Sequence, residues 1–326
     1  MGLKSPTGAR PETRILSGSF SDPGKVRKIN QDSFFAGEIP GKGYLAIVAD
    51  GMGGHQTGEV ASLKAVTTLR RELERSRIYS PKAITKAIQL ANLEIYDYAS
   101  THPQHQGMGT TLTSVFLDDQ VGLVAHVGDS RAYLIRNNNI SLLTRDHSWV
   151  ADQVRRGLLT DEEARRHRWR NVITNALGIN QNIYLDLHHF QIQEADQIIV
   201  CSDGVNILLT DSQILQIVSN NPPIEAARQL VREANDRGGP DNITAVVIKV
   251  ESLLVRTKRY NLPENHNAFQ TVELTEKLIG MRNILEVVRP QNLWSKLQHH
   301  KWYPYRAWIL GSLGLLTLFV FFGIWR

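Results

Sequence analysis

Acidic residues lie beside several apolar, β-branched runs of this sequence, which favours a fold in which strand ends present carboxylates at a shared edge. The neighbouring runs are LAIVA, VAHVG, IIVCS and ITAVVIKV, and a fifth acidic residue lies in RKINQDS. The residues are Asp50, Asp129, Asp203, Asp241 and Asp32. One such residue alone is most simply part of a turn. Several at one edge of a rigid sheet repel one another, and bound cations make that repulsion tolerable.

The apolar runs predict strands, and two helical patterns separate the first strand from the next. Strands are expected at residues 44–49, 111–117, 121–127, 132–135, 183–190, 197–201 and 243–250. Helices are expected at 59–75, from Pro81 with Ser80 as N-cap, and at 146–156, 160–166, 211–219 and 224–235. Adjacent helices followed by runs of strands favour an α+β fold over a parallel dinucleotide-binding sheet. The charge-rich residues 154–170 are a candidate mobile flap, called the flap below.

Ligands made only of oxygen suit Mg²⁺ or Mn²⁺ rather than zinc or copper. Gly51 permits close backbone approach, so its carbonyl could also be a ligand. Two hard cations about 4 Å apart are a known device for hydrolysing phosphate esters. A nearby arginine should then hold the phosphate in bidentate fashion, and Arg27, five residues before Asp32, is the candidate.

Eight motifs in one order closely resemble the metal-dependent protein serine/threonine phosphatases of type 2C in their bacterial form. Each motif alone is weak, but the ordered set is highly specific and covers about residues 15–250. The motifs are Arg27-x-x-Asn30-Gln31-Asp32-Ser33, VADGMGG at 48–54, GTT at 109–111, HVGDSRAYL at 126–134, RDHS at 145–148, NVITNALG at 171–178, CSDG at 201–204 and GGPDNITAVVI at 238–248.

The resemblance implies a four-layer α-β-β-α sandwich of the type 2C phosphatase kind, with two Mn²⁺ or Mg²⁺ ions at one end of the paired sheets. By position, Asp50 would bridge both ions, and the Gly51 carbonyl would ligate one of them. Asp203 and Asp241 would complete the first metal. Asp32 would hold metal-bound waters.

Two further roles follow from the same resemblance. Arg27 would bind the substrate phosphate, and Asp129, with Asp203, would match a third, weaker metal site of bacterial members. The flap matches a variable segment that gates substrate access.

Met52 stands where animal members carry a histidine proposed as general acid, so leaving-group protonation would fall to metal-bound water or another group. Gln31 replaces a glutamate found in many members.

The implied activity is hydrolysis of phosphoserine and phosphothreonine in proteins by a metal-bridging water or hydroxide, without a phospho-enzyme. The expected partners are phosphorylated proteins, the substrates of a bacterial Ser/Thr kinase. A competing hypothesis is a membrane-tethered pseudophosphatase that acts as a binding or regulatory module. Such proteins typically lose metal-binding aspartates, and the retention of Asp50, Asp203 and Asp241 favours an enzyme.

The net charge of +5, from 37 basic and 32 acidic residues, lies entirely in the C-terminal part of the chain. From Glu251 onward there are ten Lys and Arg but five Glu, so residues 1–250 are neutral. This distribution argues against a nucleic-acid partner. The single cysteine, Cys201, cannot form an intramolecular disulfide and is typical of a reducing compartment.

Residues 307–325 form an uncharged apolar run of nineteen residues, long enough as a helix to span about 28 Å. Aromatic residues border it on both sides, as at membrane interfaces, and a transmembrane helix is predicted. More basic residues precede the run than follow it, which predicts a single-pass membrane protein with a cytoplasmic catalytic domain in contact with the lipid bilayer.

The chain therefore divides into four predicted parts. Residues 1–14 are an N-terminal extension, 15–250 the phosphatase domain, 251–306 a juxtamembrane linker and 307–325 the transmembrane helix. Within the linker, apolar residues spaced as in a helix from Leu274 to Val288 predict an amphipathic helix. It could pack on the domain, pair with a second copy or lie on the membrane.

Overall fold

Two antiparallel sheets account for the apolar runs in the sequence. The computed structural model describes residues 13–54, 57–76, 80–118, 121–253 and 269–275. The first sheet has the order β1 (Arg14–Asp22), β11 (Ile243–Ser252), β10 (Gln197–Cys201), β7 (Arg131–Arg136) and β8 (Asn139–Leu142). The second has the order β12 (Gln270–Leu274), β9 (Ile183–Gln191), β6 (Val121–Val127), β5 (Leu112–Leu117), β3 (Gly43–Met52) and β2 (Asp32–Ile39), with β4 (Gly109–Thr110) paired to β3.

The central strands are buried on both faces, which explains their continuous apolar sequences. In β3, Leu45 and Ile47 lie in the apolar core beneath the helices, whereas Ala46 and Val48 lie in the core between the sheets. β11 alternates in the same way between the inter-sheet core and the core under its own helices. Successive side chains of a strand point to opposite faces, so each central strand contributes to two cores.

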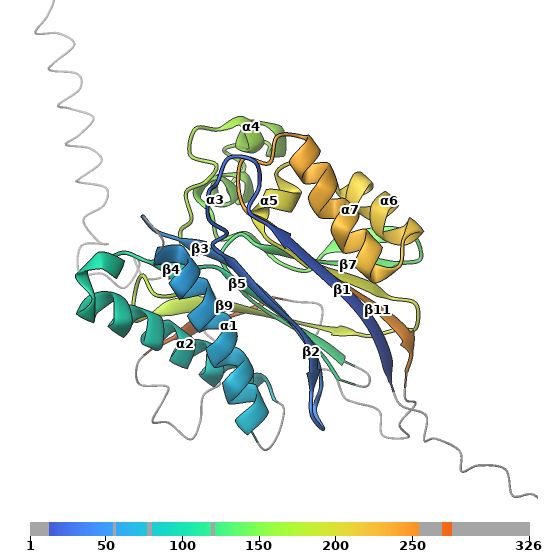
Figure 1. Ribbon diagram of the computed structural model, residues 1–326, viewed down its shortest axis with the longest axis horizontal. Coiled ribbons are helices and arrows are strands. Elements are labelled where there is room, and N and C mark those ends of the chain that lie inside the picture. The colour runs from blue at the N-terminus through green and yellow to red at the C-terminus, as the bar shows by residue number, and fades with distance from the viewer. Residues whose placement is uncertain (1–12, 55–56, 77–79, 119–120, 254–268, 276–326) are drawn as a thin grey trace, which may run out of the picture. The chain divides into compact units, whose positions relative to one another are not determined.

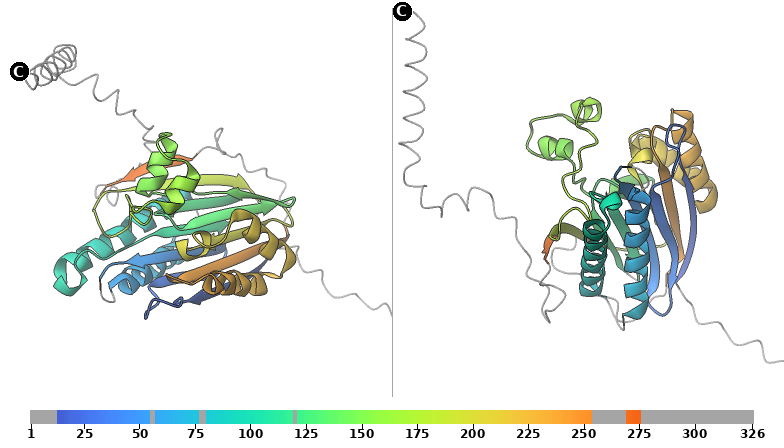
Figure 2. Two further views of the ribbon diagram at one scale, coloured as in Figure 1. Left: turned by 90° about the horizontal axis from the view of Figure 1, so that it is seen from above. Right: turned by 60° about the vertical axis from the view of Figure 1, so that its left-hand side comes forward.

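Helices cover the outer face of each sheet and complete four layers. α1 (Thr57–Arg75) and α2 (Pro81–Thr101) pack on the second sheet, and α6 (Asp211–Asn220) and α7 (Pro223–Asp236) pack on the first (Figures 1 and 2). The predicted α-β-β-α sandwich is therefore confirmed for the described residues. The remaining short elements are α3 (Trp149–Arg155), α4 (Asp161–Arg166), α5 (Asp203–Asn206) and the 3₁₀ turn Pro103–His105.

The predicted elements agree best where local signals are strong. β6 and β10 have their predicted bounds, and Ser80 caps α2 by accepting a hydrogen bond from the amide of Ala83 at 3.2 Å. The strands β1, β2 and β8 were not predicted. They carry polar or half-exposed residues because β1, β2 and β8 lie at sheet edges.

The predicted boundary of the catalytic domain at residue 250 is too early. β11 continues to Ser252, and β12 lies inside the segment predicted as a linker, where it pairs with β9. Its Val272 and Leu274 are buried in the core beneath α1 and α2. Leu274 thus ends a strand rather than beginning a helix, and residues 276–288 of the predicted amphipathic helix lie outside the described residues.

The predicted transmembrane segment at 307–325 also lies outside the described residues, as do residues 1–12. Among the helices that the structure describes, none has the length and apolarity needed to cross a membrane.

The packing of α7 on β1 generates a stability prediction for Gly18. A Cβ at this position would lie 2.2 Å from the Ile224 Cα and 2.6 Å from the Pro223 carbonyl carbon, both backbone atoms that cannot rotate away. We expect Gly18→Ala to lower the free energy of unfolding by about 1–3 kcal/mol. Gly54→Ala is the matched control, because nothing lies within 4 Å of its Cβ. Thermal unfolding of both full-length variants checks this, and equal Tm values for the two would contradict the packing argument.

Candidate active site

The five predicted acidic residues come from both sheets and meet at one end of the sandwich. Asp32 begins β2 and is paired in register with Asp50 of β3, in the second sheet. Asp203 begins α5 directly after β10, and Asp241 lies just before β11, in the first sheet. Asp129 lies in the turn between β6 and β7. One prediction needs correcting: Asp50 does not follow the end of its strand, because β3 continues through it to Met52.

Burial and mutual repulsion strongly perturb the pKa values of four of these carboxyls. Burial, followed by the charges of the four other aspartates, raises the pKa of Asp50 well above its ordinary value. Burial also raises the pKa of Asp32 to about 7 and of Asp203 to about 6, and nearby carboxylates add to both shifts. The pKa of Asp129 is raised for the same two reasons. A cluster of this kind holds negative charge only at a considerable free-energy cost unless cations compensate it.

Hydroxyl groups of the first sheet hold Asp32 of the second. Its Oδ2 accepts a hydrogen bond from Ser202 Oγ at 2.7 Å and another from Thr244 Oγ1 at 2.6 Å. The second carboxylate oxygen, Oδ1, is buried and has no hydrogen-bond partner among the described residues. Asp32 is therefore fixed in orientation with one oxygen left free for a ligand.

Asn242 fastens the loop that carries Arg27 to the turn that carries Asp241. Its side-chain amide donates to the carbonyls of Pro23 and Ile29, each at 2.9 Å, and its Oδ1 accepts from the Gln31 amide at 2.8 Å. This buried side chain thus spans the ends of the loop. Arg27, which is half-exposed, donates to Asp241 Oδ2 at 2.8 Å.

Backbone contacts place Asp50 and Gly51. The Asp50 amide donates to Thr111 Oγ1 at 2.9 Å, and the Asp50 carbonyl accepts from Thr110 Oγ1 at 2.9 Å. A Cβ on Gly51 would lie 2.1 Å from the Gly58 carbonyl oxygen, so only glycine allows the start of α1 to approach β3 here. The threonines of the GTT motif and Gly58 therefore position Asp50 and Gly51.

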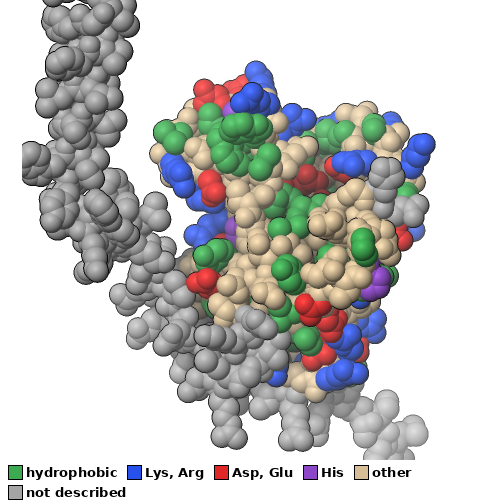
Figure 3. Space-filling model, turned by 90° about the vertical axis from the view of Figure 1, so that its left-hand side faces the viewer, with side chains coloured by type: hydrophobic (Ala, Val, Ile, Leu, Met, Phe, Trp, Pro, Cys, Tyr) green, Lys and Arg blue, Asp and Glu red, His purple; other side chains and the backbone are tan. Residues whose placement is uncertain are grey.

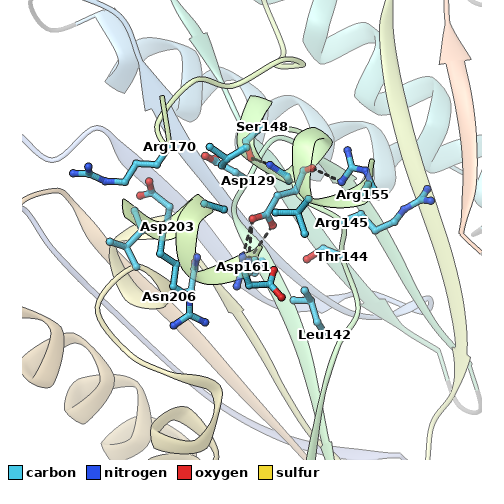
Figure 4. Close-up of a pocket in the computed structure, with 18 of the residues that line it drawn as sticks. Asp129, Leu142, Thr144, Arg145, Ser148, Arg155, Asp161, Arg170, Asp203 and Asn206 are labelled. Atoms are coloured by element: carbon cyan, nitrogen blue, oxygen red, sulfur yellow. Dashed lines mark hydrogen bonds and ion pairs between the residues drawn. The ribbon is translucent and has the colours of Figure 1, made fainter. Parts of the chain in front are cut away.

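A pocket of about 560 Å³ opens beside Asp129 and Asp203 (Figure 4). The flap, which includes α4 and the last residues of α3, also lines this pocket, with Arg155, Asp161 and Arg170. A space-filling view shows hydrophobic side chains grouped with charged ones at the flap end of the molecule (Figure 3). Residues of the aspartate cluster and residues of the flap therefore line the same pocket.

The carboxylate donors fit divalent cations in their chemistry. Asp32, Asp129 and Asp203 each have a buried Oδ1 without a hydrogen-bond partner in the described part of the chain. Within that part, no three His, Cys, Asp or Glu side chains already converge on one ion position. Other oxygens of the cluster bind neighbouring groups instead: Asp241 Oδ2 accepts from Arg27, and Asp32 Oδ2 accepts from Ser202 and Thr244. Oxygen ligands and unpaired buried carboxylates suit Mg²⁺ or Mn²⁺.

The structure brings all seven predicted site residues to this end of the sandwich. Sequence reasoning did not find the contacts of Asn242, Ser202, Thr244 or the GTT hydroxyls. Serine, threonine and asparagine are common everywhere in proteins, so only their position within the matched motifs could have drawn attention to them.

Comparisons with known proteins agree on one family. Residues 25–245 match the protein phosphatase 2C family. The serine/threonine phosphatase Stp of Listeria innocua is 34% identical over 235 residues, which cover 70% of this chain and 93% of the relative. The serine/threonine protein phosphatase PstP of Mycobacterium tuberculosis is 36% identical over 233 residues, covering 71% of this chain and 44% of PstP.

Solved structures give the same result. The crystal structure of the PstP catalytic domain in complex with two manganese ions has a TM-score of 0.66 at 32% identity, covering 73% of this chain and 99% of that one. The structure of Stp1 from Staphylococcus aureus has a TM-score of 0.70 at 30% identity, covering 76% of this chain and all of that one (100%).

The role of Asn242 in fastening the loop is testable by stability. We expect Asn242→Ala to lower the free energy of unfolding by about 1–3 kcal/mol, because it leaves buried backbone groups of the loop unpaired. The matched control is Asn220→Ala, which removes one exposed hydrogen bond to Gln216 at the end of α6. Thermal unfolding compares the two variants, and an Asn242→Ala protein as stable as the control would refute the role.

Proposed function

The chain belongs to the protein phosphatase 2C family and is a metal-dependent protein serine/threonine phosphatase, and on this premise we propose that the five-aspartate cluster is its catalytic centre. One observation carries the proposal: buried aspartates from both sheets meet at one end of the sandwich and leave three carboxylate oxygens without partners among the described residues. A structural cluster of acids would be expected to satisfy its oxygens with donors.

We assign the metal ligands within this cluster. Asp50, Asp203, Asp241 and the carbonyl of Gly51 would hold two Mn²⁺ or Mg²⁺ ions, the cofactors on which the enzyme depends. When bound, such ions lower the pKa of a water molecule and offset charge on the phosphoryl oxygens. Asp129, which has a buried oxygen without a hydrogen-bond partner among the described residues, would contribute with Asp203 to a third, weaker site.

Arg27 and Asp32 would support the reaction in different ways. Arg27 would bind the substrate phosphate with the donors that remain after its bond to Asp241, and its half-exposed position keeps it accessible. The loop held by Asn242 limits how far its backbone can move. Asp32 would orient water with its free oxygen, because Ser202 and Thr244 hold the carboxylate still.

We further propose that the substrates are proteins phosphorylated by a Ser/Thr kinase. The flap would contact the substrate chain around the phosphorylated residue, since it lines the pocket next to Asp203. Its charged side chains could interact with polar groups that flank the phosphorylated residue.

A membrane anchor completes the proposal. The uncharged run at 307–325 has the length of a bilayer span, and the excess of basic residues before it favours a cytoplasmic domain. The phosphatase would then act on substrates at the membrane surface, and the basic juxtamembrane segment would be attracted to anionic lipid headgroups.

Two substitutions separate chemistry from phosphate binding. We expect Asp203→Asn to abolish hydrolysis of p-nitrophenyl phosphate and of a phosphothreonine peptide in Mn²⁺. Arg27→Ala should mainly raise KM for the peptide, by about tenfold or more, because a charged hydrogen-bonding partner of the phosphate is lost. The controls are Asp97→Asn, on the exposed face of α2, and Arg228→Ala, on that of α7. Normal turnover in Asp203→Asn, or an unchanged KM in Arg27→Ala, would contradict the assigned roles.

The membrane topology is testable because Cys201 is the only cysteine. It is fully buried, and burial raises the pKa of its thiol to about 12, so it should not react with maleimides in the folded protein. We expect an impermeant maleimide to label Arg326→Cys in intact cells and to label Ser5→Cys only after lysis. Labelling of Ser5→Cys in intact cells would disprove the cytoplasmic placement of the domain. Release of the protein from membranes by alkaline carbonate would disprove the anchor.

A further inference from the structure

The strand β12 lies beyond the part of the chain that matches the family, yet it is joined to the active site by side-chain contacts. The family match ends at residue 245, whereas β12 comprises Gln270–Leu274. It adds an edge strand to the second sheet by pairing with β9. In this pairing Thr271 lies opposite Asp186.

Thr271 and Phe269 contact the ion pair between Arg145 and the buried Asp186. Thr271 Oγ1 donates to Asp186 Oδ1 at 2.5 Å and accepts from Arg145 Nη2 at 3.1 Å. Arg145 in turn donates to Asp186 Oδ2 at 2.9 Å, and its guanidinium lies 4.4 Å from the centre of the Phe269 ring. Arg145 is therefore held between β9 and the segment that begins β12.

Asp186 connects this group to the turn that carries Asp129. Its Oδ2 lies 3.4 Å from His147 Nε2. His147 Nδ1 accepts from the Gly128 amide at 3.2 Å and from Asn175 Nδ2 at 2.8 Å. Since Nδ1 accepts both bonds, the ring proton lies on Nε2 and points at Asp186. The His147 amide also donates to the Gly128 carbonyl at 2.7 Å, so two hydrogen bonds fix Gly128 to His147.

Asp186 is an ionised member of this chain of contacts. Burial disfavours its charge, but hydrogen bonds with His147 and Thr271 and the charge of Arg145 outweigh burial and hold the pKa well below its usual range. A buried carboxylate with this many donors is strongly oriented, and it can orient the His147 ring in turn.

We propose that β12 is a positioning strand for the active site, in which Thr271, through Asp186 and His147, fixes the turn that bears Asp129. The segment that contains Arg145 and His147 leads directly into Ser148, the N-cap of α3, and so into the flap. One strand outside the family core is thereby linked to two parts of the pocket lining, Asp129 and the flap. Only the activity readout of this proposal rests on the proposed function.

Because the two faces of β12 have different contacts, a role in positioning can be tested separately from simple packing of an edge strand. Val272 and Leu274 are buried in the core beneath α1 and α2 and attach the strand to the sandwich. Thr271 and Glu273 point to the opposite face. Among the described residues, Glu273 makes no side-chain hydrogen bond or ion pair, which makes Glu273→Gln the matched control.

The test uses the full chain with Thr271→Val, Thr271→Ser and Glu273→Gln. Thr271→Val should lower kcat for a phosphothreonine peptide about tenfold, with KM nearly unchanged, because a displaced active-site turn slows chemistry more than binding. Its Tm should fall by no more than about 4–8 °C, the effect of two lost hydrogen bonds. Thr271→Ser should restore kcat, and Glu273→Gln should match the parent protein.

Hydrogen exchange measured by mass spectrometry decides the structural claim independently of activity. Thr271→Val should speed exchange in peptides covering residues 126–131 and 145–149, while peptides from α7 exchange as in the parent. Unchanged exchange at 126–131 would overturn the proposal, as would faster exchange throughout the domain, which would indicate general destabilisation. If the parent protein hydrolysed no phosphate ester, the proposed function would fail, but the exchange comparison would still decide the role of β12.

Discussion

Electrostatic repulsion among the clustered aspartates is the constraint around which this domain is organised. Burial favours the protonated, neutral form of Asp32, Asp50, Asp129 and Asp203, and neighbouring carboxylates raise the free energy of their ionisation further. Such a cluster persists only if the surrounding structure prevents the carboxylates from moving apart. Two sheets with a shared core, each covered by helices, provide that rigidity, and the hydroxyls of Ser202 and Thr244 tie Asp32 across the junction of the sheets.

Local sequence signals predicted the interior of the fold and failed at its edges. β6 and β10 were located to the residue because both of their faces are buried and their sequences are continuously apolar. β1 was missed because it reads RILSGSFSD, in which polar residues and Gly18 conceal the strand. β12 was missed because five residues are too few to establish the alternation of apolar and polar side chains that is typical of a strand. Leu274 also fits a helical spacing with later residues.

The site was predicted less by chemistry than by the order of motifs. The aspartates could be selected because they flank apolar runs, and the resemblance then gave each one a role. The groups that hold them in place could not be selected, because their partners are distant in sequence. Ser202 and Thr244 are 170 and 212 positions from Asp32, and Asn242 is 211 positions from Gln31. No local pattern encodes such contacts, which exist only once the sheets pack.

The division of the aspartates between two sheets affects when the enzyme can become active. β11, the strand that pairs with both β1 and β10, is synthesised last among the strands of the first sheet. While the chain is still being made and residues 243–252 are inside the ribosome, the first sheet lacks its central connection and Asp241 has no strand to hold it. A nascent chain therefore cannot remove phosphate groups from its surroundings, and activity begins only with the completed sandwich.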